Sequence, residues 1–131
     1  MRITRIVEHI ESNEIFVFGS NEAGRHGKGA AKTALKFGAK YNIARGLCGN
    51  TYAIPTKNDK IKTLSTQKIK KYVDEFITFA ETHTNFGFLV TEIGCGLAGY
   101  TPEDIAPMFQ RAIPLEHVHL PASFWKILNK K

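Results

Sequence analysis

Cysteine is scarce in this sequence: the 131 residues include 2, Cys48 and Cys95, and they lie far apart. Neither belongs to a CxxC pair, and no cluster of cysteine and histidine has the spacing of a zinc site. We therefore expect no metal and no bound cofactor. Two free thiols in a reducing compartment are the simplest prediction, with a single disulfide as the alternative.

Long apolar runs are also lacking. No stretch approaches the roughly 20 apolar residues that a membrane-spanning helix requires. Residues 1–5 contain no apolar core of the kind found in signal peptides. These absences predict a soluble, cytoplasmic protein without a membrane partner.

What is present is an ordinary globular composition with a basic charge. A hydrophobic fraction of 43% and a charged fraction of 23%, together with the chain length, predict a single domain over residues 1–131. The net charge of +6 favours an anionic partner. No RNA- or DNA-binding signature accompanies the charge, so a small anionic molecule is favoured over a nucleic acid.

Strand and helix signals alternate along the chain. Strands are predicted at residues 3–10, 15–18, 51–56, 86–93 and 118–120. Helices are predicted at residues 28–37, at 66–81, from 101 onward and at 123–128. This alternation is typical of an α/β sandwich in which helices flank a mixed, largely parallel sheet.

Glycine is concentrated in two places. Five of the 11 glycines lie between residues 19 and 38, and three more lie between residues 94 and 99. Each cluster follows a predicted strand and leads into a predicted helix, so both loops are expected at the sheet edge where such folds bind ligands. Glycine allows a ligand to approach the backbone closely, and free N–H groups at the start of the next helix favour a phosphate.

Two common phosphate-binding motifs are excluded. A Walker loop requires Lys and then Ser or Thr after its second glycine, but Ala30 and Ala31 follow Gly29. A dinucleotide fingerprint requires a third glycine three residues after Gly29, where Lys32 stands.

A more specific match comes from two motifs taken in order. The first is Phe16-Val17-Phe18, then Asn21, then Gly27-Lys28-Gly29-Ala30-Ala31, and the second is Thr91-Glu92-Ile93 followed by Gly94-Cys95-Gly96-Leu97-Ala98-Gly99-Tyr100. Together they resemble the motifs of the macrodomain family and, more narrowly, those of small macrodomain-like proteins of phages and bacteria. The resemblance implies a three-layer sandwich that binds ADP-ribose or a related nucleotide, as a reader or a sequestering protein.

Ligand-binding residues are predicted in both loops and, if the strand at 51–56 is parallel, at its end. They are Gly19, Ser20, Asn21, Gly24, Gly27, Lys28, Gly29, Ala30, Thr56, Lys57, Gly94, Cys95, Gly96, Leu97, Ala98, Gly99 and Tyr100. The resemblance implies that the first loop faces a ribose and a phosphate, that Asn21 binds the distal ribose and that the second loop covers the diphosphate.

Catalysis is the alternative function, since some macrodomains are hydrolases. The protein would then remove ADP-ribose from a substrate or dephosphorylate an ADP-ribose phosphate. Asn21 would hold the ribose, and His26 would be the general base because imidazole titrates near neutral pH. Two further catalytic roles are a nucleophile for Cys95 and a catalytic carboxylate for Glu92. The simpler structural alternatives are a turn cap for Asn21, an exposed position for His26, a small buried thiol for Cys95 and a surface charge for Glu92.

Overall fold

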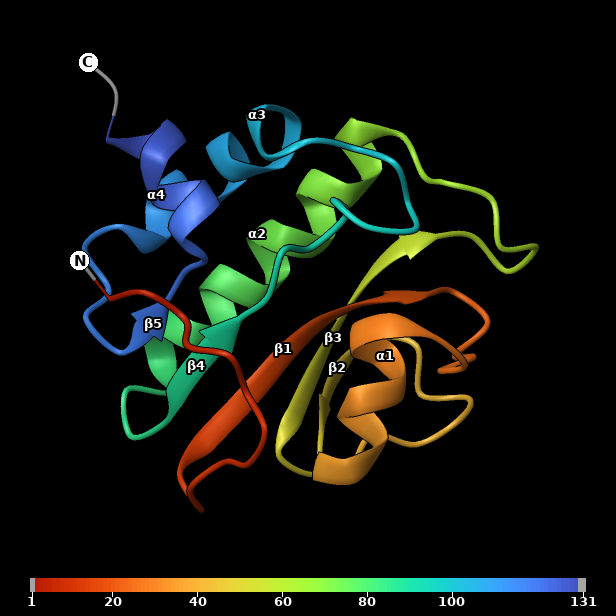
Figure 1. The fold of residues 1–131 in the computed structure, drawn as a ribbon, viewed down its shortest axis with the longest axis horizontal. Helices are drawn as coiled ribbons and strands as arrows, with labels where there is room; N and C mark the ends of the chain where they lie inside the picture. Colours follow the sequence, from red (N-terminus) through yellow and green to blue (C-terminus); the bar gives the residue numbers. More distant parts are fainter. Residues whose placement is uncertain (1, 130–131) are drawn as a thin grey trace.

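A five-stranded sheet forms the centre of the computed structural model, which describes residues 2–129 (Figure 1). Its strands are β1 (Glu14–Asn21), β2 (Gly46–Cys48), β3 (Thr51–Lys57), β4 (Gly87–Val90) and β5 (Val118–His119). The helices are α1 (Gly29–Ala34), α2 (Thr66–Thr82), α3 (Pro102–Ile105) and α4 (Ala122–Leu128), with the 3-10 helices η1 (Leu35–Phe37) and η2 (Ala106–Ala112). The strand order is β2-β3-β1-β4-β5, and all neighbours pair in parallel except β2 and β3.

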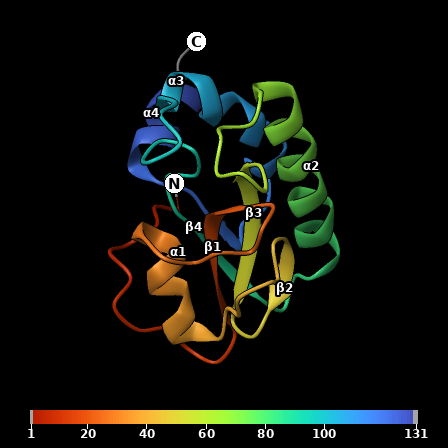
Figure 2. The same ribbon diagram turned by 90° about the vertical axis from the view of Figure 1, so that its right-hand side faces the viewer.

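The central strand β1 is buried on both faces. Ile15 and Val17 pack in a large hydrophobic cluster with residues of α2, η2 and α4, whereas Phe16 and Phe18 pack in a smaller cluster with α1. Successive side chains of a strand point to opposite faces, so a strand covered by helices on both sides is apolar throughout. Figure 2 shows the sheet between α1 on one side and α2 on the other, which confirms the expected three-layer sandwich.

Helix ends follow local signals in the sequence. The Ser65 side chain accepts a hydrogen bond from the Lys68 N–H at 3.2 Å and caps α2, whose buried face includes Val73 and Phe76. Thr101 and Asp104 form a capping box at the start of α3. Gly38 adopts a φ of 110° at the end of η1 and stops the helical segment, as expected for glycine.

Three predicted elements differ from those in the structure. Residues 3–10 do not form a strand but make a single bridge, from Ile3 to Leu120, and the side chain of Ile6 is exposed. The strand predicted at 86–93 ends at Val90, because the chain then turns and the Ile93 N–H bonds to the Thr91 carbonyl. The helix that begins at Pro102 continues as a 3-10 helix after one turn, where Pro107 supplies no N–H for an α-helical bond.

Three further features concern membrane-spanning helices, metal-binding clusters and disulfide bonds. Within residues 2–129, no helix is long and apolar enough to cross a membrane, and no group of three or more His, Cys, Asp or Glu residues is arranged to hold a metal ion. Cys48 and Cys95 are both free thiols, so the alternative of a disulfide is wrong.

Candidate functional site

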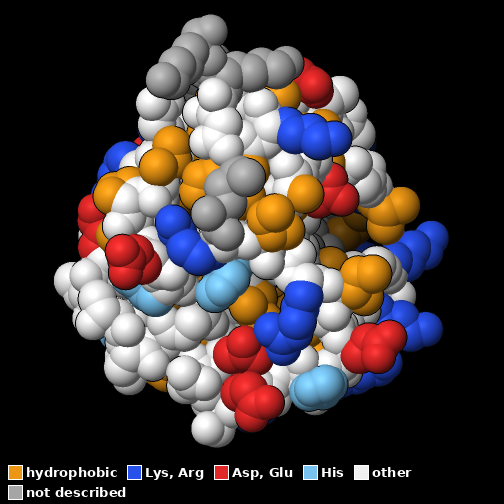
Figure 3. All heavy atoms as spheres, turned by 60° about the vertical axis from the view of Figure 1, so that its left-hand side comes forward, with side chains coloured by type: hydrophobic (Ala, Val, Ile, Leu, Met, Phe, Trp, Pro, Cys, Tyr) orange, Lys and Arg blue, Asp and Glu red, His pale blue; other side chains and the backbone are white. Residues whose placement is uncertain are grey.

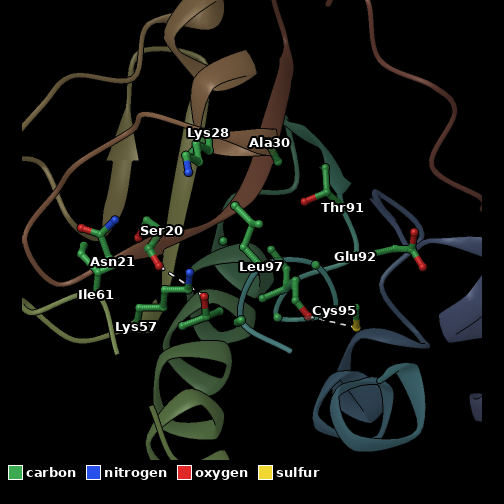
Figure 4. A pocket seen from close by; sticks show the side chains of 18 of the residues that line it. Ser20, Asn21, Lys28, Ala30, Lys57, Ile61, Thr91, Glu92, Cys95 and Leu97 are labelled. Atoms are coloured by element: carbon green, nitrogen blue, oxygen red, sulfur yellow. Dashed lines mark hydrogen bonds between the residues drawn. The ribbon is translucent and has the colours of Figure 1, made fainter. Parts of the chain in front are cut away.

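A cavity of about 490 Å³ opens where the parallel strands β1, β3 and β4 end (Figure 4). One part of its wall is the chain from the end of β1 through the start of α1, and another is the loop that follows β4. The two glycine loops therefore meet at one site, because β1 and β4 pair in parallel and their carboxyl ends lie at the same edge of the sheet.

Most of the residues predicted from the sequence line this cavity. They are Gly19, Ser20, Asn21, Gly27, Lys28, Gly29, Ala30, Thr56, Lys57, Gly94, Cys95, Gly96, Leu97 and Ala98. Four predicted residues do not line it: Gly24, His26, Gly99 and Tyr100. Each of the four instead shapes or supports one of the loops.

Gly24 and Tyr100 have structural contacts that explain their positions. Gly24 has a φ of +71°, and a Cβ atom there would lie 2.6 Å from the Cα of Asn42, so only glycine fits against that backbone. The Tyr100 hydroxyl donates a hydrogen bond to the Leu64 carbonyl at 2.7 Å, and its ring packs against the large cluster. Gly99, with a φ of +89°, forms the turn before Tyr100, where its N–H bonds to the Gly96 carbonyl.

Asn21 lines the cavity, but its amide group holds the first loop together. Its Nδ2 donates to the Arg25 carbonyl at 2.7 Å, and its Oδ1 accepts from the Arg25 N–H at 3.0 Å. This pair of bonds is the turn cap that was the simpler alternative for this residue. One N–H of the amide and one lone pair of Oδ1 are not used by these two bonds.

His26 is buried rather than exposed, so the expected exposed position is wrong. Its Nε2 donates to the Lys40 carbonyl at 2.9 Å, and its ring packs against Phe18 and Tyr41, with ring centroids 5.4 and 5.7 Å away. The solvent-exposed fraction of the residue is 0%. The imidazole thus anchors the loop to the segment around Lys40 and has no face on the cavity, which removes the proposed pairing of His26 with Asn21.

The second loop is shaped by its glycines and by Cys95. Gly94 has a φ of +75°, and a Cβ there would lie 3.2 Å from the Ile105 side chain. The Cys95 thiol donates to the Ile93 carbonyl at 3.4 Å and points away from Leu97 (Figure 4). Burial, with nearby Glu92 next in importance, raises the pKa of the Cys95 thiol to about 11. The side chain is therefore a neutral thiol at physiological pH and a poor nucleophile.

The charged side chains of the lining are mostly cationic. Arg25, Lys28 and Lys57 line the cavity, and Glu92 is the one carboxylate among its lining residues. Glu92 is turned away from the loops, because it accepts a hydrogen bond from the Ser123 hydroxyl at 2.7 Å (Figure 4). The cavity thus offers cations and glycine backbone to a ligand, a combination that suits an anion.

Six residues outside the predicted binding set complete the lining: Arg25, Ala31, Ile61, Thr91, Glu92 and Ile93. Five of them lie within the two sequence motifs. Ile61 does not, since it belongs to the loop after β3, and its position depends on how that loop folds back. The Thr63 hydroxyl donates to the Ala98 carbonyl at 2.9 Å and joins this loop to the second glycine loop.

Comparisons with known proteins bear on the fold. No family model and no curated protein sequence matches the chain. The chain is similar to a solved structure of a protein of unknown function from Bacteroides thetaiotaomicron, with a TM-score of 0.59 and 13% sequence identity over 87% of this chain and 88% of that one. At this identity the likeness concerns the three-layer architecture alone.

Proposed function

We propose that the protein binds ADP-ribose, or a closely related ADP-ribose-derived nucleotide, in the cavity between its two glycine-rich loops. The observation that carries the proposal is that both loops line one cavity of about 490 Å³. This volume lies within the range of about 300–1,000 Å³ that is usual for small-molecule sites. Three cationic side chains in the lining supply charges opposite to those of a diphosphate.

A second cavity supports an extended ligand. It is lined by residues of the N-terminal segment, including Arg5 and Val7, and it shares Ala30, Thr91 and Glu92 with the first cavity. Figure 3 brings the N-terminal side of the molecule forward and shows a hollow in the surface with charged side chains of both signs around it. An ADP-ribose molecule, which has a sugar or base at either end of its diphosphate, can extend over the shared residues into this space.

Binding without turnover is the form of the function that the geometry favours. The amide of Asn21 is bonded to the Arg25 backbone, His26 is buried off the cavity, and the pKa of the Cys95 thiol is raised. The protein thus acts as a reader or a sequestering protein for its nucleotide.

The mixed charges of one face give no support to nucleic acid as the main partner. Figure 3 shows positive and negative side chains interspersed on one face, without a continuous basic stripe. Binding to nucleic acid would then be weak and would disappear at moderate salt.

Calorimetric titration with ADP-ribose tests the proposal, with AMP and NAD as comparison ligands. The Gly27→Val and Gly96→Val variants place a side chain at glycines that line the cavity and have no positive φ, and a Cβ atom at either position would have no neighbour within 4 Å. Each variant is expected to weaken ADP-ribose binding by about tenfold or more, because the added methyl groups occupy ligand space. The melting temperature should stay within about 2 °C of the wild type, as for other open surface sites.

Gly87→Val is the matched control. Gly87 begins β4, at the opposite end of the strand from the cavity, and a Cβ there would lie 4.0 Å from the Glu14 side chain. Its affinity for ADP-ribose should equal that of the wild type. Wild-type protein that binds no ADP-ribose, or cavity variants that bind it normally, would disprove the proposal, and cleaved ligand in the titration mixture would establish the hydrolase alternative instead.

A further inference from the structure

Ile61 adopts a backbone conformation that suits it poorly. Its φ is 62°, in the left-handed region, where a β-branched side chain is a genuine outlier. Among the described residues the other non-glycine residue with positive φ is Asn42, at 73°, and asparagine tolerates this region well. An isoleucine at such a position is kept against a local cost in free energy.

The surrounding loop fixes this conformation. The Asn58 side chain oxygen accepts hydrogen bonds from the N–H groups of Lys60, at 2.8 Å, and Lys62, at 3.0 Å. The Asn58 N–H bonds to the Lys62 carbonyl at 2.7 Å, and the Ile61 N–H bonds to the Asn58 carbonyl at 3.0 Å. These four bonds close a short turn around residue 61 and stabilise its left-handed conformation.

The strained turn directs an apolar side chain to the cavity instead of the core. Ile61 lines the cavity, and 39% of its surface is exposed. Leu97, from the second glycine loop, also lines the cavity and is 67% exposed. In Figure 4 Ile61 lies beside Asn21 at one side of the cavity, and Leu97 lies nearer its middle. Neither residue belongs to the buried clusters, so core packing does not explain why they are apolar.

The two loops that present these side chains are joined to each other. The bond from the Thr63 hydroxyl to the Ala98 carbonyl connects them directly, at 2.9 Å. The bond from the Tyr100 hydroxyl to the Leu64 carbonyl, at 2.7 Å, holds the chain just beyond. The loops that carry Ile61 and Leu97 are thus held together by two hydrogen bonds.

We propose that Ile61 is a ligand-contacting specificity residue, which together with Leu97 forms an apolar wall against which a sugar or base ring of the bound nucleotide packs. This inference rests on the proposed function, since the cations of the lining hold the phosphates while the wall selects for a ring beside them. The strained turn is what turns the isoleucine toward the ligand. A ligand that has phosphates but no ring gains nothing from this wall.

The test compares three variants. Ile61→Asn removes the apolar side chain and suits the left-handed backbone, and Ile61→Leu keeps an apolar side chain without branching at Cβ. Ile43→Asn is the matched control, because Ile43 is 41% exposed, does not line the cavity and has no positive φ. Melting temperatures are measured without ligand, ADP-ribose affinity is measured by calorimetry, and fluorescence of 8-anilinonaphthalene-1-sulfonate, a planar aromatic anion, is measured as a second probe.

The expected results separate strain from ligand contact. Ile61→Asn should melt about 3–6 °C above Ile43→Asn, because it relieves the strain that the control retains. It should nevertheless bind ADP-ribose about fivefold more weakly, or worse, since it loses apolar contact with the ring. Ile61→Leu and Ile43→Asn should bind within about twofold of the wild type.

Two outcomes would overturn the inference. In the first, Ile61→Asn binds ADP-ribose as well as the wild type does. In the second, the melting temperature of Ile61→Asn is no higher than that of Ile43→Asn. If the wild type binds no ADP-ribose, the proposed function is wrong, and the fluorescence of 8-anilinonaphthalene-1-sulfonate then tests the apolar wall by itself. Fluorescence that is lost in Ile61→Asn but kept in Ile43→Asn supports the wall, and equal fluorescence in the two variants refutes it.

Discussion

Cys95 lies in the cavity wall between two glycines, but its thiol is held as a hydrogen-bond donor. The Sγ–H bonds to the Ile93 carbonyl at 3.4 Å, and burial raises the pKa to about 11. Neighbouring carboxylates, Glu92 first and then Asp104 and Glu103, act in the same direction because they disfavour a thiolate. The thiol therefore belongs to the structure of the loop and not to its chemistry.

Cys95 is accordingly expected to resist alkylation. At pH 8 a thiol with a pKa of about 11 is ionised to about one part in a thousand, and the thiolate is the reactive form. In a Cys48→Ser variant, iodoacetamide should modify Cys95 far more slowly in folded protein than in urea-unfolded protein, as followed by mass spectrometry. The rate should rise continuously up to about pH 11. Rapid modification of the folded protein at pH 8 would show that the thiol is ionised.

Individual residues of the site were predictable to different degrees. The position of both glycine loops at one edge of the sheet was predictable, because a strand followed by glycine is a local signal. The burial of His26 was not predictable, since it depends on Phe18 and Tyr41, which reach the ring from other parts of the chain. The direction of the Ile61 side chain depends on a turn that Asn58 closes. Nothing in the sequence indicates that the isoleucine in this turn has a positive φ.

At the scale of elements, a polar contact joins the end of β1 to α2. Glu22, the residue after β1, accepts a hydrogen bond from the Tyr72 hydroxyl, and its carboxylate lies 3.1 Å from the Lys68 amine. The bond from Tyr72 is the main cause that lowers the pKa of Glu22, with Lys68 contributing further and burial opposing both. The contact fixes the first glycine loop, which begins at this point, relative to the longest helix.

This contact predicts a dependence of stability on pH. Because the pKa of Glu22 is lowered in the folded state, its stabilisation is present at neutral pH and is lost as the pH falls through that lowered value. Tyr72→Phe returns the pKa toward normal, so the variant should lose less stability than the wild type between pH 7 and pH 3. Urea midpoints at several pH values measure this difference.

The control for this measurement is Tyr41→Phe. The Tyr41 hydroxyl contacts the His26 carbonyl at 3.4 Å and no carboxylate, so its removal should leave the pH dependence unchanged. Parallel curves for the wild type and Tyr72→Phe would show that Glu22 is not coupled to Tyr72.

The elements that can be predicted well are those whose pattern is continuous. The apolar run of β1 and the apolar stripe of α2 are both continuous signals, and serine, here Ser65, is a favoured N-cap. The edge strand β2 was missed because three residues carry no periodicity, and its pairing with β3 is a tertiary contact. The strand predicted at residues 3–10 rests on a loose alternation, but in the structure the segment pairs at Ile3 alone.

At the scale of the whole molecule, Arg2 joins the two ends of the chain. Its Nε donates to the Val118 carbonyl at 3.1 Å, and its Nη2 reaches the carbonyls of Ala112, at 3.3 Å, and Ile113, at 3.2 Å. The guanidinium also lies over the Trp125 ring, 5.3 Å from its centroid. One side chain near the N-terminus thus satisfies carbonyls at the end of η2, in the turn after it and at the start of β5.

Arg2→Lys is expected to destabilise the protein by about 2 kcal/mol, because an ammonium cannot reproduce a planar fork that bonds several carbonyls at once. Arg5→Lys is the comparison, since Arg5 forms an ion pair with Glu14 at 2.8 Å whose arginine side chain is 43% exposed. That change should cost at most about 1 kcal/mol, as exposed pairs do. Chemical denaturation measures both, and equal losses would show that Arg2 is an ordinary surface residue.

The position of β1 at the centre of the sheet has a consequence for how the chain folds. Its partner β4 lies far along the sequence, since Glu14 pairs with Gly87, and the bridge from Ile3 to Leu120 spans a still longer stretch. The pairings of β1 with β3 and of β4 with β5 join segments that are closer in sequence. Because contacts between distant segments form slowly, the pairing of β1 with β4, and with it the cavity at their carboxyl ends, is expected to be completed late in folding.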